Sequence, residues 1–220
     1  MHAKRGLFIT FEGTDGSGKT TQLRRLIERL RNEGYEVVET VEPGGTRIGN
    51  QIRRILLDPE NQELSPTAEM LLYFASRAQN TAECIVPALE AGKIVVCDRF
   101  TDSTLVYQGA GRGLGDDVVR ALHAIACGTL QPGITLYLDM DLETSLERAQ
   151  ARNREGSARN ESRLDDESIE FHRRVRDAYF RLAAAEPDRF RVIDARPDAG
   201  IVEKSVWAVV SAAMEYVRVP

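Results

Sequence analysis

The chain has 220 residues, of which 42% are hydrophobic and 29% charged, which is enough for one well-packed domain and too little for two of ordinary size. Its formal net charge is −5, whereas a general nucleic-acid binder more often carries a basic face. Its apolar runs are far shorter than the ~20 residues of a membrane span, and the run near the N-terminus is too short for a secretory signal. We therefore expect a single domain, residues 1–220, located in the cytoplasm, with neither a nucleic acid nor a membrane as partner.

Apolar runs of strand length alternate with segments of helical period, which is typical of a parallel sheet covered by helices. The runs are apolar nearly throughout, as in strands that are buried on both faces. Between them, apolar residues recur every three or four positions, for example at Leu23, Leu26, Ile27 and Leu30, which predicts helices. We expect an α/β fold with a five-stranded parallel sheet flanked by helices, whose strands are Leu7–Phe11, Glu36–Thr40, Ile94–Cys97, Thr135–Leu138 and Phe190–Ile193.

One segment, Asn153–Glu167, is polar and charged and has no apolar period. A solvated surface loop would have the same composition. However, arginines crowd this segment and its flanks, and a long irregular segment in a compact domain is often a mobile cover over a site. We expect it to form a small arginine-rich lid over phosphate groups.

The segment Gly13–Thr20 reads GTDGSGKT and matches the phosphate-binding pattern G-x-x-x-x-G-K-[ST]. It follows the first predicted strand and opens a predicted helix, which is the context that the pattern requires. Its glycines allow backbone N–H groups to wrap an anion closely, and the helix that follows adds the positive end of its dipole. Lys19 should reach the β- and γ-phosphates of a nucleoside triphosphate, and the Thr20 hydroxyl should hold Mg²⁺.

The third predicted strand ends at Cys97-Asp98-Arg99-Phe100. An Asp at this strand end lies where a second Mg²⁺ contact would be made, and the adjacent Arg99 offers a fork of donors to another phosphate. A surface Asp–Arg pair is the plainer alternative, but parallel sheets bind their ligands at this carboxyl edge. Because the chain has neither a DxxG segment beyond the P-loop nor the NKxD segment of a switch GTPase, the motifs favour a nucleotide kinase.

Four blocks follow in order along the chain: FEGTDGSGKTT, EPGGT with R-I-G, DRF with TDST, YQG and GRG, and SRLD. Together they resemble the bacterial thymidylate kinase family, and the similarity runs from Leu7 to the last helix. The resemblance implies a P-loop kinase fold, ATP-dependent phosphorylation of dTMP to dTDP, a requirement for Mg²⁺, and a homodimer.

The resemblance also implies individual roles. Thr20 and Asp98 would manage Mg²⁺, Arg53 and Arg99 would hold the acceptor phosphate, and Asp15 would meet the 3′-hydroxyl of the acceptor. Spacing supports one pair, since Tyr73 and Arg77 are four residues apart on a helical stretch and share a face on which they could grip one ring. The ATP-binding residues would be Gly13, Thr14, Asp15, Gly16, Ser17, Gly18, Lys19, Thr20 and Thr21, and the remaining dTMP residues Tyr73, Arg77, Ser103, Thr104, Tyr107 and Gln108.

The chain departs from the family pattern at two places, Val41 and Tyr73, and at Gly16 it differs from the eukaryotic type. Val41 stands where relatives often carry an Arg before EPGG, Tyr73 replaces a Phe, and Gly16 stands where the eukaryotic type has a P-loop Arg. The bacterial type brings its catalytic arginines from the lid, and the candidates are Arg148, Arg152, Arg154, Arg159 and Arg163.

We expect the acceptor phosphate to attack the γ-phosphorus in line, with Lys19, Mg²⁺, Arg99 and a lid arginine neutralising charge. Two alternatives stay open at this point. One is a kinase for another pyrimidine nucleotide or a deoxynucleoside, and the other is an ATP-binding module that no longer transfers phosphate.

Overall fold

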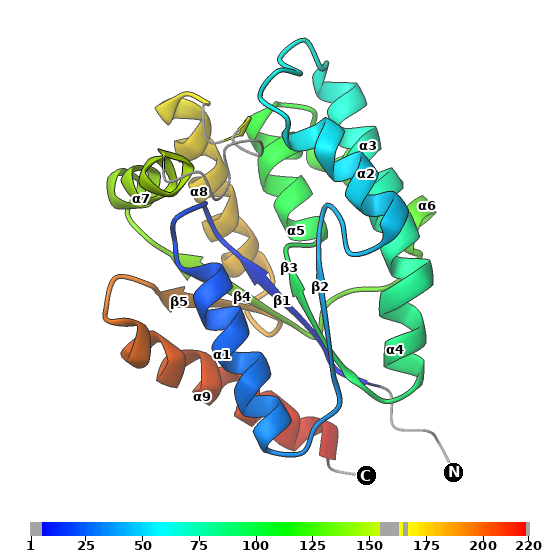
Figure 1. Ribbon diagram of the computed structural model, residues 1–220, viewed down its shortest axis with the longest axis vertical. Coiled ribbons are helices and arrows are strands. Elements are labelled where there is room, and N and C mark those ends of the chain that lie inside the picture. Colours follow the sequence, from blue (N-terminus) through cyan, green and yellow to red (C-terminus); the bar gives the residue numbers. More distant parts are fainter. Residues whose placement is uncertain (1–5, 155–162, 165–166, 219–220) are drawn as a thin grey trace.

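The computed structural model describes residues 6–154, 163–164 and 167–218. Its centre is a sheet of five parallel strands in the order β2-β3-β1-β4-β5 (Figure 1). The strands are β1 (Phe8–Glu12), β2 (Val37–Val41), β3 (Ile94–Asp98), β4 (Ile134–Asp139) and β5 (Phe190–Asp194). The predicted α/β class and all five predicted strands are therefore confirmed.

Each strand ends one residue later than the apolar runs predict. In β1, β3, β4 and β5 this last residue is an acid, namely Glu12, Asp98, Asp139 and Asp194. Strand pairing continues through the acid, because the ladder needs only the backbone. The carboxyl edge of the sheet is consequently lined with carboxylates, and this is the edge at which parallel sheets bind ligands.

Helices α1 (Lys19–Asn32) and α9 (Ala199–Arg218) cover one face of the sheet (Figure 1). Their apolar stripes pack on the strand residues that point to this side, such as Ile9, Phe11 and Val96. Alternate strand residues, such as Phe8 and Val95, point to the opposite side and pack under other helices. The helix stripe predicted from Leu23 to Leu30 is thus the core side of α1.

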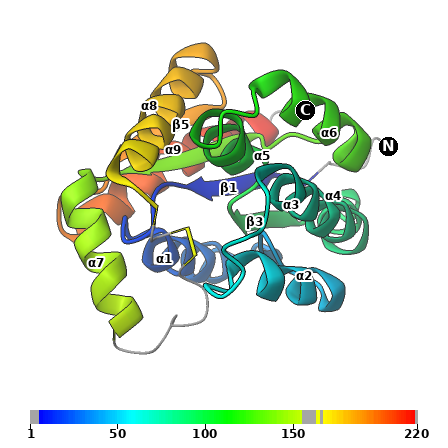
Figure 2. The same ribbon diagram turned by 90° about the horizontal axis from the view of Figure 1, so that it is seen from above.

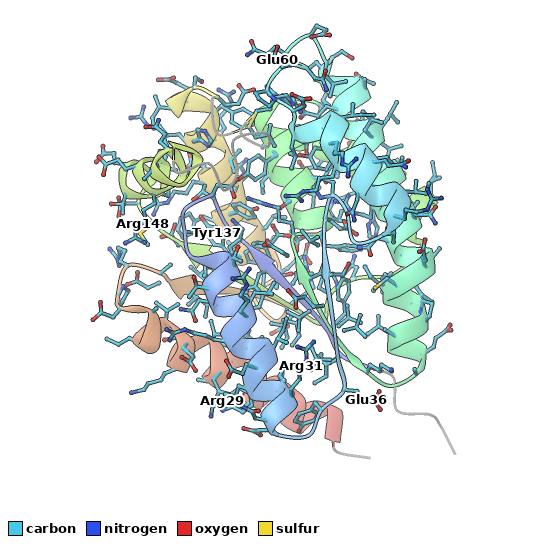
Figure 3. All side chains as sticks on the ribbon, in the orientation of Figure 1. Arg29, Arg31, Glu36, Glu60, Tyr137 and Arg148 are labelled. Atoms are coloured by element: carbon cyan, nitrogen blue, oxygen red, sulfur yellow. The ribbon has the colours of Figure 1, made fainter. Side chains whose placement is uncertain are left out.

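The opposite face is covered by α3 (Pro66–Asn80), α4 (Val86–Glu90), α6 (Asp116–Cys127) and α8 (Ile169–Ala185). Helix α2 (Arg47–Leu57) lies outside α3, and α7 (Leu142–Arg154) extends away near the N-terminus of α1 (Figure 2). Side chains fill the space between the sheet and both helix layers (Figure 3). No helix in the part of the chain that the structure describes is long and apolar enough to span a membrane.

Two stretches have the wider π-helical turn, η1 (Thr81–Ile85) and η2 (Leu105–Gly111). The second continues directly from the short helix α5 (Thr101–Thr104), so the segment after β3 is one helical run up to Gly111. The YQG block therefore lies on a widened turn, a feature that is common at functional sites.

Candidate active site

The carboxyl edge of the sheet opens into a cavity of about 570 Å³, a size within the usual range for small-molecule sites. Its walls come from the P-loop, the start of α1, the end of β2, α2, α3, the end of β3 and η2. The lining residues are Asp15, Gly16, Gly18, Lys19, Thr20, Thr21, Arg24, Val41, Glu42, Pro43, Arg53, Leu57, Tyr73, Arg77, Asp98, Arg99, Ser103, Tyr107, Gln108 and Leu164.

The P-loop connects β1 to α1 and forms one end of this cavity. Gly16 and Gly18 have φ angles of 82° and 92°, which side chains rarely adopt. The Lys19 ammonium lies under the loop, where it donates to the carbonyl oxygens of Gly13 and Thr14, both at 2.9 Å, and lies 3.6 Å from Asp15 Oδ1. Burial lowers the pKa of Lys19, and the charge of Arg99 acts in the same direction. The loop therefore concentrates positive potential beside backbone N–H groups, which suits a polyanion.

Arg99 bridges the P-loop and the helical run that follows β3. Its φ of 69° is the one left-handed angle outside glycine among the residues that the structure describes. Its Nη2 lies 3.3 Å from Asp15 Oδ2 and its Nη1 donates to Ser103 Oγ at 3.1 Å, while the guanidinium sits over the Tyr107 ring at 5.1 Å. The turn thus holds a fixed cation between the two ends of the cavity.

Asp98 and Thr20 both line the cavity and carry side-chain oxygen atoms. Asp98 Oδ1 is buried, and it has no hydrogen-bond partner among the described residues. A buried carboxylate oxygen without a donor is costly unless a cation meets it. Mg²⁺ is usually held by one or two protein oxygens together with phosphate oxygens, so this pair fits a magnesium ion that is shared with a nucleotide.

The other end of the cavity is built around Arg77, which is 1% exposed. Its Nε donates to Glu42 Oε2 at 2.6 Å, and its Nη2 donates to Phe100 O and Thr104 Oγ1 at 3.1 and 2.9 Å. Its Nη1 has no hydrogen-bond partner within the described ranges, although it is buried. Three of its five N–H donors are thus fixed by the protein, and the two on Nη1 have no acceptor among the described residues.

Tyr73 and Arg77 line the same cavity, in agreement with the face that their spacing predicts. Tyr73 is 8% exposed and packs with Leu56 and Leu57, and burial raises the pKa of its hydroxyl to about 12. Arg53, Ser103, Tyr107 and Gln108 also line the wall, whereas Thr104 lies behind it and fixes Arg77.

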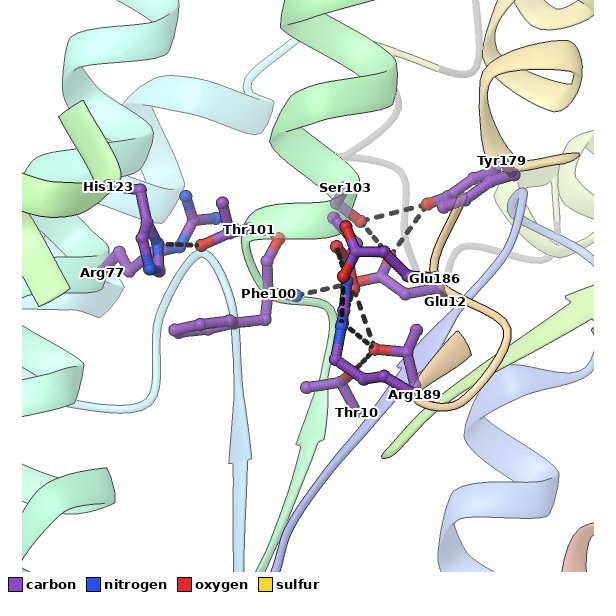
Figure 4. A network of polar contacts seen from close by, with 12 residues as sticks. Thr10, Glu12, Arg77, Phe100, Thr101, Ser103, His123, Tyr179, Glu186 and Arg189 are labelled. Atoms are coloured by element: carbon purple, nitrogen blue, oxygen red, sulfur yellow. Dashed lines mark hydrogen bonds and ion pairs between the residues drawn. The ribbon is translucent and has the colours of Figure 1, made fainter. Parts of the chain in front are cut away.

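Two buried acids, Glu42 on the cavity wall and Glu12 behind it, are site residues that the sequence analysis missed. Glu42 holds Arg77; burial raises its pKa, and the Arg77 charge opposes that rise. Glu12 accepts hydrogen bonds from Phe100 N at 2.9 Å, from Ser103 Oγ at 2.5 Å and from Tyr179 Oη at 2.8 Å (Figure 4). Their signal in the sequence is weak, because acids are expected at the surface.

One cavity residue beyond the motifs, Arg24, follows Thr20 by one helical turn on α1. This i, i+4 spacing is a signal that the sequence does contain. Arg24 and Val41 line the same cavity, so the cavity holds a cation beyond the motifs although Val41 replaces the family Arg before EPGG.

The structure describes the side chains of two of the five candidate lid arginines, Arg148 and Arg163. Arg148 is exposed on α7, whose backbone lies against Gly16. Arg159 and the side chains of Arg152 and Arg154 lie outside the described residues, as does most of the predicted lid segment. Arg163 is buried and faces away from the phosphate end, since its guanidinium donates to Leu56 O and Glu69.

A strand, a glycine loop around a buried lysine, and a helix, set at the carboxyl edge of a parallel sheet, define a P-loop α/β protein. Comparison with known proteins narrows this class. The family model for thymidylate kinase matches residues 11–206. The chain is 50% identical to the thymidylate kinase of Pelobacter propionicus over 210 residues, which is 96% of this chain and 94% of that protein.

The thymidylate kinase of Geobacter sulfurreducens is 48% identical over 215 residues, which cover 98% of this chain and 99% of that one. The crystal structure of thymidylate kinase from Ehrlichia chaffeensis superimposes with a TM-score of 0.75 at 34% identity, covering 94% of this chain and 99% of that chain. The chain belongs to the thymidylate kinase family.

Proposed function

We propose that the chain transfers the γ-phosphoryl group of ATP to dTMP and forms dTDP within the one cavity described above. The observation that carries the proposal is the order of groups along its wall. A P-loop lies at one end, the Tyr73–Arg77 pair at the other, and Arg99 with Asp15 between them. Two nucleotides placed with their phosphates toward Arg99 would meet end to end, which is the geometry of in-line transfer.

On the donor side, Gly13 to Thr21 would hold ATP, with Lys19 on the β- and γ-phosphates. The Lys19 ammonium group already lies in the loop, where hydrogen bonds to Gly13 O and Thr14 O hold its position. A cation that is positioned before the reaction stabilises developing charge without further reorganisation. Mg²⁺ held by Thr20 and Asp98 would neutralise part of the triphosphate charge.

On the acceptor side, Arg53 and Arg99 would hold the phosphate of dTMP. Arg53 lines the cavity, and its Nη1 donates to Pro43 O at 2.8 Å. The attacking phosphate oxygen is already anionic, so the reaction needs placement and charge neutralisation rather than a strong base. The arginines of α7 and the segment after it, Arg148, Arg152, Arg154 and Arg159, would supply further positive charge to the transferring group.

At the base end, the Tyr73 ring would stack on thymine, and Arg77 Nη1 would donate to a base carbonyl oxygen. Arg77 is held on three sides by Glu42, Phe100 and Thr104. A donor that is fixed in a buried wall selects strongly for a ligand with an acceptor at that point. This arrangement favours a pyrimidine with a carbonyl there.

We also propose that the enzyme acts in the cytoplasm as a homodimer. Its three cysteines are free, as in proteins of reducing compartments. Helix α3 packs against both α2 and α6, and these three helices carry exposed apolar side chains: Ile48, Ile55, Leu71, Val118 and Ile125. A surface of this kind is typical of a protein–protein contact.

The decisive experiment measures ADP release with ATP, Mg²⁺ and one of five acceptors: dTMP, dUMP, CMP, GMP or thymidine. We expect the highest kcat/KM with dTMP and stoichiometric dTDP. Lys19→Ala should reduce kcat by about a thousandfold or more while circular dichroism stays unchanged, and chelation of Mg²⁺ should stop turnover. A faster reaction with another acceptor would reassign the substrate, and an active Lys19→Ala enzyme would refute the role of the P-loop.

A further inference from the structure

Glu69 lies in the first turns of α3 with none of its surface exposed. Its carboxylate accepts hydrogen bonds from three side chains, two of them from one segment and the third from a distant part of the chain. Gln108 Nε2 donates to Oε1 at 2.7 Å, Arg112 Nη2 donates to Oε2 at 3.1 Å, and Arg163 Nη2 donates to Oε2 at 2.6 Å. One buried anion therefore joins α3, η2 with the turn after it, and the turn at 163–164.

The two arginines are those of the GRG and SRLD blocks, and neither lines the cavity. Burial opposes the ionisation of Glu69, but hydrogen bonds from Arg112 and Gln108 and the charges of both arginines outweigh it and lower its pKa. Arg112 is in turn paired with Glu167 at 2.6 Å. The charges of two acids and two arginines thus balance, so the Glu69 carboxylate stays ionised and keeps accepting these hydrogen bonds.

The contacts of Glu69 lead to the cavity by two routes, one through Gln108 and one through Arg163 and Leu164. Gln108 lines the wall directly. A carboxylate only accepts hydrogen bonds, so it holds the NH₂ end of Gln108 toward itself and turns the carbonyl oxygen away. The orientation of this amide is therefore set from behind the wall.

The second route runs through Arg163. Its Nε donates to Leu56 O at 2.6 Å while its Nη2 contacts Glu69, so its position is fixed at two points. The next residue, Leu164, packs on the cluster of Leu56, Leu57 and Tyr73 and lines the cavity. Leu164 is thereby placed beside the ring that we assign to the base.

We propose that Glu69 is a positioning residue for the acceptor nucleotide: it orients the Gln108 amide and, through Arg163, places Leu164 against Tyr73. The proposal rests on the proposed function, since it assigns the Tyr73 end of the cavity to dTMP. Glu69 touches no substrate, and its effect should therefore fall on the acceptor and not on ATP.

The test compares steady-state constants of Glu69→Gln and Arg163→Lys with those of the unmodified enzyme. A glutamine keeps the size but has one acceptor oxygen for three donors, and a lysine cannot bridge Leu56 O and Glu69 with a planar fork. For each variant we expect the KM for dTMP to rise about tenfold or more, with the KM for ATP within about twofold. Stabilisation of the protein by saturating dTMP, read from the midpoint of thermal unfolding, should fall in parallel, while stabilisation by ATP should not.

Matched controls are Glu170→Gln and Arg173→Lys, because these two side chains form an exposed pair on α8 and are each 64% exposed. Both should leave all constants unchanged. Equal changes in the two KM values, or unchanged constants in a folded Glu69→Gln or Arg163→Lys protein, would overturn the proposal. If Glu69→Gln does not fold, Arg163→Lys alone decides. An unmodified enzyme that makes no dTDP would instead refute the proposed function, so the two failures are distinguishable.

Discussion

Glu12 is the last residue of β1, and its carboxylate is buried behind the turn that carries Arg99. Burial raises its pKa from 4.5 to about 7, and the negative charge of Asp102 adds to this, while Arg99 and the Ser103 and Phe100 hydrogen bonds act in the opposite direction. The hydroxyls of Ser103 and Tyr179 also face it. The folded protein therefore binds this proton more tightly than the unfolded chain does.

This raised pKa predicts how stability depends on pH. The contribution of Glu12 is fully present below about pH 4.5 and is lost as the pH rises through about 7, because the unfolded chain then releases the proton first. Glu12→Gln removes the titration and keeps the shape of the protonated acid. Between pH 5 and pH 8 the free energy of unfolding of the unmodified protein should fall by about 2 kcal/mol relative to that of Glu12→Gln, measured by urea denaturation.

The comparison of the two proteins at each pH cancels the titration of other groups, including Glu42, whose pKa burial also raises. A difference in unfolding free energy that stays constant from pH 5 to pH 8 would show that Glu12 is ionised throughout.

At the scale of elements, the P-loop is pressed against α7. A Cβ at Gly16 would lie 2.1 Å from Ser145 O and 3.1 Å from Arg148 Cβ, and the φ of Gly16 is 82°. An arginine at this position, as in the eukaryotic type, would thus collide with helix backbone. The absence of a P-loop Arg is therefore matched by a helix that occupies its place.

We predict that Gly16→Ala lowers the free energy of unfolding by about 3 kcal/mol, because left-handed strain adds to the displacement of α7. The same displacement should raise the KM for ATP more than that for dTMP. The matched control is Gly34→Ala, since Gly34 has a similar φ of 85° with no atom within 4 Å of a new Cβ. Gly34→Ala should lower the free energy of unfolding only by the backbone strain, about 1–2 kcal/mol, and should leave both KM values unchanged. Equal effects of Gly16→Ala and Gly34→Ala would contradict the contact with α7.

The strands and the phosphate loop could be predicted because one local sequence rule dominates each of them. Long apolar runs located all five strands, and the glycine pattern located the phosphate loop, because both follow from local sequence. The widened turns η1 and η2 were not predictable, since their period is close to that of an α-helix over so few residues. The placement of Arg163 was also beyond the sequence, because its partner Glu69 lies 94 positions away.

The buried acids show a second limit. Glu12, Glu42 and Glu69 are each at most 2% exposed, yet a carboxylate in a sequence is ordinarily read as surface. Each is buried because several donors converge on it in the fold. Such convergence is a property of tertiary structure, and spacing along the chain does not reveal it.

At the scale of the whole molecule, the helices α2, α3 and α6 are neighbours (Figure 2), and each of them carries exposed apolar side chains. Ile125 on α6 is 82% exposed. If this surface joins two copies of the chain, Ile125→Asp should place a charge in an apolar contact and convert the dimer to a monomer in sedimentation velocity.

The control for this prediction is Ile201→Asp, because Ile201 is 55% exposed on α9, which covers the opposite face of the sheet. It should leave the sedimentation coefficient unchanged. A monomeric unmodified protein, or a dimeric Ile125→Asp variant, would exclude the surface as the dimer contact.

The unpaired Nη1 of Arg77, with its two N–H groups, bears on the design of inhibitors. Because Glu42, Phe100 and Thr104 occupy its other donors, the guanidinium cannot turn to satisfy Nη1 elsewhere. A compound that fills this end of the cavity with hydrocarbon would strand a buried N–H, and leaving such a donor unsatisfied costs about 1–3 kcal/mol or more. An inhibitor should therefore keep a carbonyl or an equivalent acceptor next to Arg77 Nη1, and the rest of its ring can be varied.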